Sequence, residues 1–329
     1  MHKFARIGLT VGAVAALGLT GCASSTPAGG GSAAPLRIAY ASDLDPNDIA
    51  DQFGIQAAGA ESTALTEDSA VTAGLQNGNY DLGNIDITAA IKAIQAGLPL
   101  KIVYVSQNLP EFVMVSQSDI TDLQGLEGKT VAYHSAGSLT EILERELVSQ
   151  NVPEIDSSIN WTVLPESPNR AAAMVAGRID ATTLEYLDVL ALQKQGDFNV
   201  LGSWKDLTGP SGDAIATVWV ATDSFISQHE DQLVDFLKDV QAGYDKTYAD
   251  EDAWLALAQE LVPDVDPADL KDAYAYYTGS DMYPESGVPP ITEERWAGLN
   301  DFFQQIGEYD QSASIDMVDL DIVDEVNGS

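Results

Sequence analysis

The chain has 329 residues, with 51 Asp and Glu against 15 Lys and Arg, and its formal net charge at pH 7 is −36. This excess of negative charge excludes nucleic acid as a partner, because the phosphate backbone is bound by Lys and Arg. It suits a solvated, secreted surface, and the length is ample for two lobes with cores of their own.

The first 22 residues are predicted to be a signal peptide. Lys3 and Arg6 precede an apolar run over 7–19, which is shorter than the about 20 residues that span a membrane. Residues 19–22, LTGC, resemble a bacterial lipobox, in which the cysteine is lipidated and begins the mature protein. Cys22 is the one cysteine of the sequence, so we expect a lipid anchor there and a location on the extracytoplasmic face of the cell membrane. The Gly/Ser/Ala-rich residues 23–35 predict a flexible tether.

Beyond the tether, short apolar strands alternate with helical periodicities, which predicts α/β lobes with mainly parallel sheets. The predicted strands are 36–42, 62–65, 80–85, 100–106, 112–116, 130–133, 160–164, 179–184, 199–201 and 214–221. The predicted helices are 68–77, 87–94, 139–150, 170–176, 186–195, 225–248, 251–261, 267–277 and 292–307. The acidic segment 316–325 is interpreted as a solvated face.

The most informative turn is SAGS at 135–138, between a strand and a helix. Ser138 with Glu141 three residues later is a capping box, so we expect the helix to satisfy its own N-terminal N–H groups. The preceding Gly128-Lys129-Thr130 imitates the end of a P-loop, but Leu123 stands where the first glycine belongs, which excludes a nucleotide site.

The acids of 43–48 do not form a calcium loop. Asp48 stands where that loop needs glycine, and Gly54 stands where it needs glutamate. The sequence therefore predicts no metal and no cofactor.

The two halves of the α/β region resemble each other. Residues 38–42 align with 131–135, and 78–81 align with 177–180. The offset of 99 residues in the second pair also places Asp86 on Glu185. We interpret this as an internal pseudo-repeat whose equivalent strand ends face one cleft.

An ordered set of segments along the chain resembles the solute-binding proteins of bacterial ABC importers, in the group for nitrate, aliphatic sulfonates, taurine and thiamine-pyrimidine precursors. The segments are LRIAY at 36–40, AGLQNGNYDLGNID at 73–86, DLQGLEGKTVAYHSAGS at 122–138, NRAAAMVAGRIDATTLEYL at 169–187, VATDSFISQHEDQLVDFLKDV at 220–240 and PPITEERWAGLNDFFQQIG at 289–307. The resemblance implies a type II periplasmic-binding-protein-like α/β fold, with two lobes, a hinge and a ligand cleft between the lobes. It implies lobe one at 36–116 plus 222–329, lobe two at 117–221, and a monomer that delivers a small molecule to an ABC permease and its ATPase.

The chain departs from this group where ligand identity is concerned. The segment after the first strand is rich in Asp, and Glu185-Tyr186 stands where many members have Asp-Pro. The resemblance therefore does not transfer the ligand.

Strand ends and neighbouring positions of both lobes are predicted to line the cleft. The candidate ligand-binding residues are Ser42, Asp43, Asn84, Asp86, His134, Ser135, Gly137, Ser138, Glu185, Tyr186 and Trp219. Asp86 and Glu185 offer carboxylates and no Arg or Lys occupies a strand end, which favours an amine-bearing or nitrogen-containing solute, such as a taurine-like zwitterion or an aminopyrimidine thiamine precursor. Three alternatives stay open: Asp86 caps the helix at 87, Glu185 is simply solvated, and His134 is a surface residue.

Other functions compete with this one. The cleft could take an aliphatic sulfonate, nitrate or an aromatic acid, or the chain could be a ligand-sensing lipoprotein. An enzyme resembling the eukaryotic thiamine-pyrimidine synthases would need reactive His and Lys in the cleft, but the sequence has only His2, His134 and His229 and no G-x-S-x-G elbow. We therefore predict binding without catalysis.

Overall fold

The structure, a computed structural model, describes residues 34–65, 67–212, 214–307 and 312–328. The predicted signal peptide, Cys22 and the tether up to residue 33 lie outside the described residues. Within the described part of the chain, no helix is long and apolar enough to cross a membrane.

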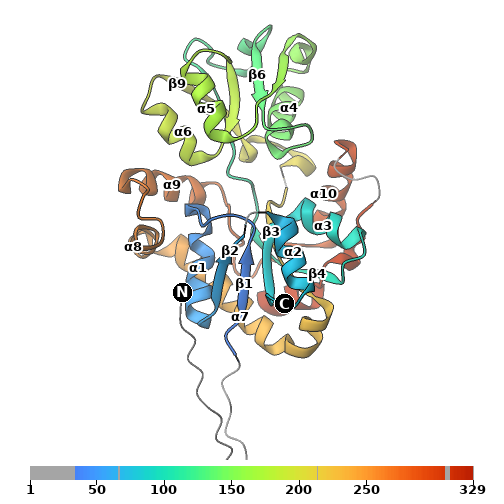
Figure 1. The fold of residues 1–329 in the computed structure, drawn as a ribbon. Helices are drawn as coiled ribbons and strands as arrows, with labels where there is room; N and C mark the ends of the chain where they lie inside the picture. Colours follow the sequence, from blue (N-terminus) through green and yellow to red (C-terminus); the bar gives the residue numbers. More distant parts are fainter. Residues whose placement is uncertain (1–33, 66, 213, 308–311, 329) are drawn as a thin grey trace, which may run out of the picture. The chain divides into compact units, whose positions relative to one another are not determined.

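The first sheet has the strand order β2-β1-β3-β10-β4 (Figure 1). Its strands are β1 (Arg37–Tyr40), β2 (Glu61–Ala64), β3 (Leu82–Asp86), β4 (Leu100–Gln107) and β10 (Thr217–Thr222). β1 pairs in parallel with β2 and β3, whereas β10 runs antiparallel between β3 and β4. Strands β3, β4 and β10 are almost continuously buried because elements cover both faces of the sheet.

The second sheet repeats this plan with the order β7-β6-β8-β5-β9. Its strands are β5 (Val113–Gln117), β6 (Thr130–Tyr133), β7 (Asn160–Val163), β8 (Ala181–Leu184) and β9 (Phe198–Ser203). β6, β7 and β8 take the places of β1, β2 and β3, and β5 takes the antiparallel place of β10. The predicted pseudo-repeat is confirmed: Asp86 ends β3, and Glu185 directly follows the equivalent β8.

The strand pairings differ from the predicted lobe borders at 116/117 and 221/222. β5 pairs with β8 and β9 of the second sheet, and β10 pairs with β3 and β4 of the first. The chain therefore crosses between the sheets over 108–112 and again between β9 and β10. An apolar run predicts a strand but not the strand with which it pairs. The predicted borders therefore placed most of β5 in lobe one and most of β10 in lobe two, and both assignments are wrong.

Eleven α-helices are found among the described residues. Before β5 come α1 (Ile49–Ala58), α2 (Asp68–Gln76) and α3 (Ile87–Gln95); between β6 and β9 come α4 (Leu139–Asn151), α5 (Ser167–Val175) and α6 (Tyr186–Gln193); after β10 come α7 (Asp223–Ala249), α8 (Glu251–Leu261), α9 (Pro267–Gly279), α10 (Glu293–Gln305) and α11 (Leu320–Asn327). α11 covers most of the acidic segment that was predicted to be a solvated face, and it buries Ile322, Val323 and Val326.

Helices α1 and α7 pack closely because glycines stand at their contact. A Cβ atom on Gly54 would lie 2.4 Å from Cα of Val240, and one on Gly243 would lie 2.7 Å from the carbonyl oxygen of Ala50. This close approach brings Asp51 of α1 against Tyr244 of α7, whose hydroxyl donates a 2.5 Å hydrogen bond to the carboxylate.

Asp51 is a buried carboxylate that its neighbours satisfy. The hydroxyls of Ser106 and Tyr40 also donate to it, at 2.8 and 3.1 Å, and Asn84 donates through its side-chain amide at 3.3 Å. Burial raises the pKa of Asp51 to about 6, although the hydrogen bonds from Tyr244, Ser106 and Tyr40 lower it. The cluster connects α1 and α7 to strands β1, β3 and β4.

Candidate ligand-binding cleft

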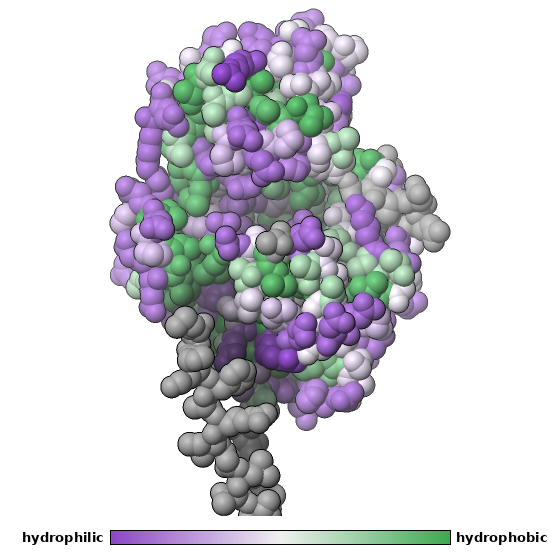
Figure 2. All heavy atoms as spheres, in the orientation of Figure 1, coloured by the Kyte–Doolittle hydropathy of each residue, from purple (hydrophilic) through white to green (hydrophobic). Residues whose placement is uncertain are grey.

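Two adjoining cavities, of about 290 and 270 Å³, lie where the two sheets face each other. Both are lined by Asp86 at the end of β3, Phe112 in the crossing segment, Leu139 at the start of α4 and Glu185 after β8. Because the cavities have residues of both lobes and of the crossing segment in common, they form one cleft. In Figure 2 the face shown is hollowed between the two lobes, and hydrophilic residues border the hollow.

Most of the predicted site residues line this cleft. They are Ser42, Asn84, Asp86, His134, Gly137, Ser138 and Glu185. They come together because the carboxyl ends of equivalent strands in the two sheets face the same space, as the pseudo-repeat predicted.

Four predicted residues lie outside the lining: Asp43, Ser135, Tyr186 and Trp219. Trp219 is 0% exposed, in a strand with neighbours on both sides, and its indole N–H donates to the hydroxyl of Tyr244. Tyr186 of α6 stacks on Tyr276 of α9, with ring centroids 4.0 Å apart. Both aromatic rings therefore serve packing, which a sequence pattern does not distinguish from ligand contact.

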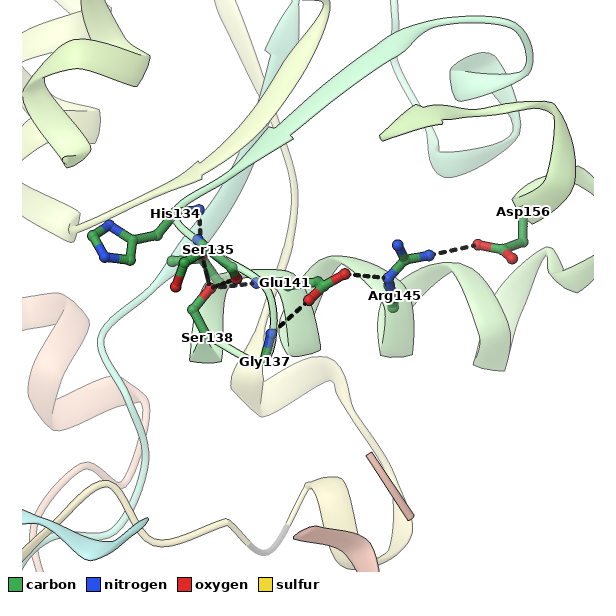
Figure 3. Close-up of polar contacts among 8 residues, drawn as sticks. His134, Ser135, Gly137, Ser138, Glu141, Arg145 and Asp156 are labelled. Carbon is green, nitrogen blue, oxygen red and sulfur yellow. Dashed lines mark hydrogen bonds and ion pairs between the residues drawn. The ribbon is translucent and has the colours of Figure 1, made fainter. Parts of the chain in front are cut away.

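The turn before α4 is held by a network of its own side chains (Figure 3). Ser138 caps the helix by accepting the N–H of Glu141, and its hydroxyl donates to the carbonyl oxygen of Ser135 at 2.7 Å. Glu141 reaches back to the N–H of Gly137 at 2.8 Å, not to that of Ser138 as in a standard capping box. Arg145 holds the Glu141 carboxylate at 2.8 Å, so the helix fills its own N-terminal anion position.

Asp86 and Glu185 are the N-cap residues of α3 and α6, yet neither side chain forms a cap hydrogen bond. The open alternative that Asp86 caps α3 is therefore wrong. Both carboxylates meet solvent through the cleft mouth, and both line its two cavities. Equivalent positions of the repeat thus present two uncapped carboxylates from opposite lobes.

Negative charges crowd the cleft. Although Asp86 is exposed at the cleft, the surrounding protein reduces its hydration and, with the charge of Asp68 nearby, raises its pKa to about 7. Burial, followed by the charges of Asp188 and Asp45, raises the pKa of Glu185 as well. A bound cation would relieve this repulsion, whereas a bare anion would add to it.

Glu111 adds a third carboxylate from the crossing segment. Burial and the charge of Glu185 raise the pKa of Glu111 to about 8. The hydroxyl of Tyr277 donates to it at 2.9 Å, and the side-chain amide of Asn47 donates at 3.2 Å. Glu111 thus connects the crossing segment to α9 and to the short 3₁₀ helix Pro46–Asp48 before α1.

Glu111, Phe112 and Arg170 are lining residues that the sequence analysis missed as ligand contacts. Glu111 and Phe112 lie beside or in the predicted strand 112–116, at the predicted border of lobe one. A cleft between lobes is lined by the segment that crosses between them, so this border could have pointed to both residues. Arg170 comes from α5 and not from a strand end. Nothing in the helical periodicity of 170–176 marked it.

No group of three or more His, Cys, Asp or Glu side chains that could hold a metal ion occurs among the described residues.

Comparisons with solved structures show the fold. The chain is similar to the ligand-binding component of an ABC-type import system from Staphylococcus aureus, solved with zinc bound, at 18% identity over 89% of this chain and 99% of that chain, with a TM-score of 0.69. It is also similar to the periplasmic aliphatic sulphonate binding protein SsuA from Escherichia coli, at 20% identity over 87% of this chain and 92% of that one, with a TM-score of 0.66. The alkanesulfonate-binding protein SsuA from Xanthomonas axonopodis pv. citri, bound to MOPS, gives 18% identity over 88% and 99% of the two chains, with a TM-score of 0.62. The two-lobed α/β periplasmic-binding-protein fold expected from the sequence is thereby confirmed.

No curated protein matches the chain. The family model described as NMT1/THI5 like matches residues 61–253, more than half of the chain. The resemblance seen in the ordered segments is confirmed, and this chain belongs to the NMT1/THI5-like family.

Proposed function

We propose that this protein is the extracytoplasmic solute-binding component of an ABC importer and that it captures a small amine-bearing solute. The observation that carries the proposal is the pair of carboxylates of Asp86 and Glu185. Neither forms an N-cap hydrogen bond, and both line the same cavities from opposite lobes. A charged amine between them would be held by both lobes at once. The fold common to binding components of import systems supports the role.

The charge of the lining favours an amine over a bare anion. Six acidic residues line the two cavities, namely Asp45, Asp48, Asp86, Glu111, Glu166 and Glu185, and Arg170 is the only Lys or Arg among the lining residues. The turn before α4 has already filled its anion position with Glu141. Phe112 adds an aromatic ring to both cavities, a type of surface that also attracts cations.

The cavity volumes suit a small solute, such as a taurine-like zwitterion or an aminopyrimidine thiamine precursor. Because both lobes line the site, a ligand that touches both favours a closed arrangement over an open one. The crossing segments are where such a hinge motion would occur. We propose binding without chemical conversion, so the solute should be recovered unchanged.

The partners of this function are an ABC permease and its ATPase, with the binding protein acting as a monomer. Lipid on Cys22 would hold it at the outer face of the cell membrane, within reach of the permease. The lipobox at 19–22 and the tether behind it support this location.

The test is calorimetry and thermal shift on residues 23–329. The panel contains taurine, an aminopyrimidine, an alkyl amine, ethanesulfonate, nitrate and benzoate. A bound amine at 100 times its Kd should add about 2.7 kcal/mol to the free energy of unfolding. Binding confined to ethanesulfonate, nitrate or benzoate would overturn the proposed charge preference.

A further inference from the structure

Arg170 is a positive charge buried beside the cleft. Its side chain is 1% exposed, yet it lines the cavity of about 290 Å³. Its Nε donates to the carbonyl oxygen of Thr183 at 2.9 Å, and its Nη1 donates to that of Leu164 at 3.2 Å. These two bonds fix the plane of the guanidinium and leave further N–H donors.

The hydrogen-bond partners of Arg170 carry no charge. Among the described residues, no carboxylate lies within 4.0 Å of its guanidinium. Its principal negative neighbour is Glu144, which is completely buried, and burial raises the pKa of Glu144 well above its usual range. Burial disfavours the charged form of Glu144, which weakens its neutralisation of Arg170. A buried charge without an ion-pair partner is costly, so the cavity gains stability from an anionic group at this place.

Other donors lie on the same wall. The Nδ1 atom of His134 accepts the N–H of Glu166 at 3.2 Å, so in the neutral ring the proton resides on Nε2, which is then a donor. Figure 3 shows this ring turned away from the hydrogen bonds of α4. The hydroxyl of Ser167 accepts the N–H of Glu185 at 3.2 Å and keeps its own hydrogen.

The backbone beside these donors is strained. Glu166, the residue before α5, has φ 63° and ψ 128°, a conformation that a side chain other than glycine rarely adopts. Such strain persists where the surroundings impose it, and it gathers at ligand sites. The strained residue places the start of α5, and with it Ser167 and Arg170, against the cavity.

We propose that Arg170, with His134 and Ser167, binds the carboxylate or sulfonate group of a zwitterionic solute whose amine lies between Asp86 and Glu185. This inference rests on the proposed function and adds a second charge to its ligand. A ligand with only a cation would give Arg170 no anionic hydrogen-bond partner beyond its more distant acidic neighbours. A ligand with only an anion would face the carboxylates of Asp86 and Glu185. A zwitterion would pair its amine with Asp86 and Glu185 and its anionic group with Arg170.

The first test compares each zwitterion with its two halves by calorimetry on residues 23–329. Taurine is compared with ethanesulfonate and ethylamine, β-alanine with propionate and ethylamine, and the same is done for homologues with three and four carbons. We expect at least one zwitterion to bind tenfold or more tightly than either half, and the sulfonate and carboxylate series separate the two anions. If amines bind as tightly as the zwitterions, or if no zwitterion exceeds its halves, the anion subsite is refuted. Amine binding without a zwitterion advantage would still leave the proposed function intact.

The second test uses Arg170→Gln, with Arg178→Gln as the matched control. Arg178 is exposed, follows the same helix and lies outside the cavities, so its replacement changes the net charge equally. Arg170→Gln should weaken the preferred zwitterion about 30-fold or more and should not weaken the amine half. An equal loss for both ligands would indicate a merely structural role and refute the subsite.

Because Arg170→Gln removes two bonds to backbone carbonyls, its folding must be checked by thermal unfolding. Ser167→Ala provides a milder variant that leaves the guanidinium in place. It should weaken the zwitterion several-fold and spare the amine half. Unchanged zwitterion affinity in both variants would also refute the subsite.

Discussion

Replacement of Asp86 and Glu185 by their amides should weaken ligand binding and at the same time stabilise the free protein. Asp86→Asn and Glu185→Gln keep the shape of each side chain and remove its charge. In the free protein neither carboxylate forms a cap hydrogen bond, and neighbouring acids repel both. Their removal therefore relieves repulsion, whereas in the complex it removes the partner of the amine.

The size of the binding effect follows from the surroundings of the two carboxylates. Removing one partner of a buried charge pair costs about 2–5 kcal/mol. Because both side chains keep contact with solvent through the cleft mouth, we expect the lower limit, about 2 kcal/mol or about 30-fold in Kd for each variant. The double variant should lose less than the sum, because both carboxylates act on one amine.

The assay is calorimetry with the best amine-bearing ligand, combined with thermal unfolding of the free protein at pH 7.5. Glu127→Gln is the control, because Glu127 is an exposed acid outside the cleft and the charge change is the same. Unchanged Kd in both cleft variants would refute the assigned amine position. A lower Tm of the free variants would refute the repulsion between the acids.

Four further results are expected. Cys22→Ala should move the protein from the membrane to the soluble fraction, and a variant that stays membrane-bound would contradict the lipid anchor. Saturating ligand should reduce the radius of gyration in small-angle scattering, and an unchanged radius would exclude a large closure. The Tm of the free protein should fall as pH rises from 5 to 8. In the folded state Asp86 and Glu111 keep their protons up to pH values of about 7 and 8, whereas the unfolded chain loses them near pH 4. A Tm that rises over this range would contradict the raised pKa values. Tyr244→Phe should lower the free energy of unfolding by about 1–3 kcal/mol, because it removes a donor from buried Asp51, and urea unfolding measures this loss.

Local features of the protein were determined by the sequence itself. The cap of α4 by Ser138 follows from residues three positions apart, and the strands and helices follow from periodicities within about ten residues. The equivalence of Asp86 and Glu185 could also be predicted, because these residues are separated by the same 99 positions as the aligned segments 78–81 and 177–180. The ordered segments were sufficient to identify the family.

Only the tertiary structure decided how distant segments pair and which side chains they bury. Whether β5 or β10 joins the first or second sheet depends on hydrogen bonds to strands far away in the chain, which no local pattern encodes. The same applies to Trp219 of β10, which contacts Phe236 and Tyr244 of α7 and is completely buried. The place of Arg170 at the cavity could not be predicted from the sequence for the same reason. Carbonyl groups from two other segments hold its guanidinium beside the cavity, and only packing brings these segments together.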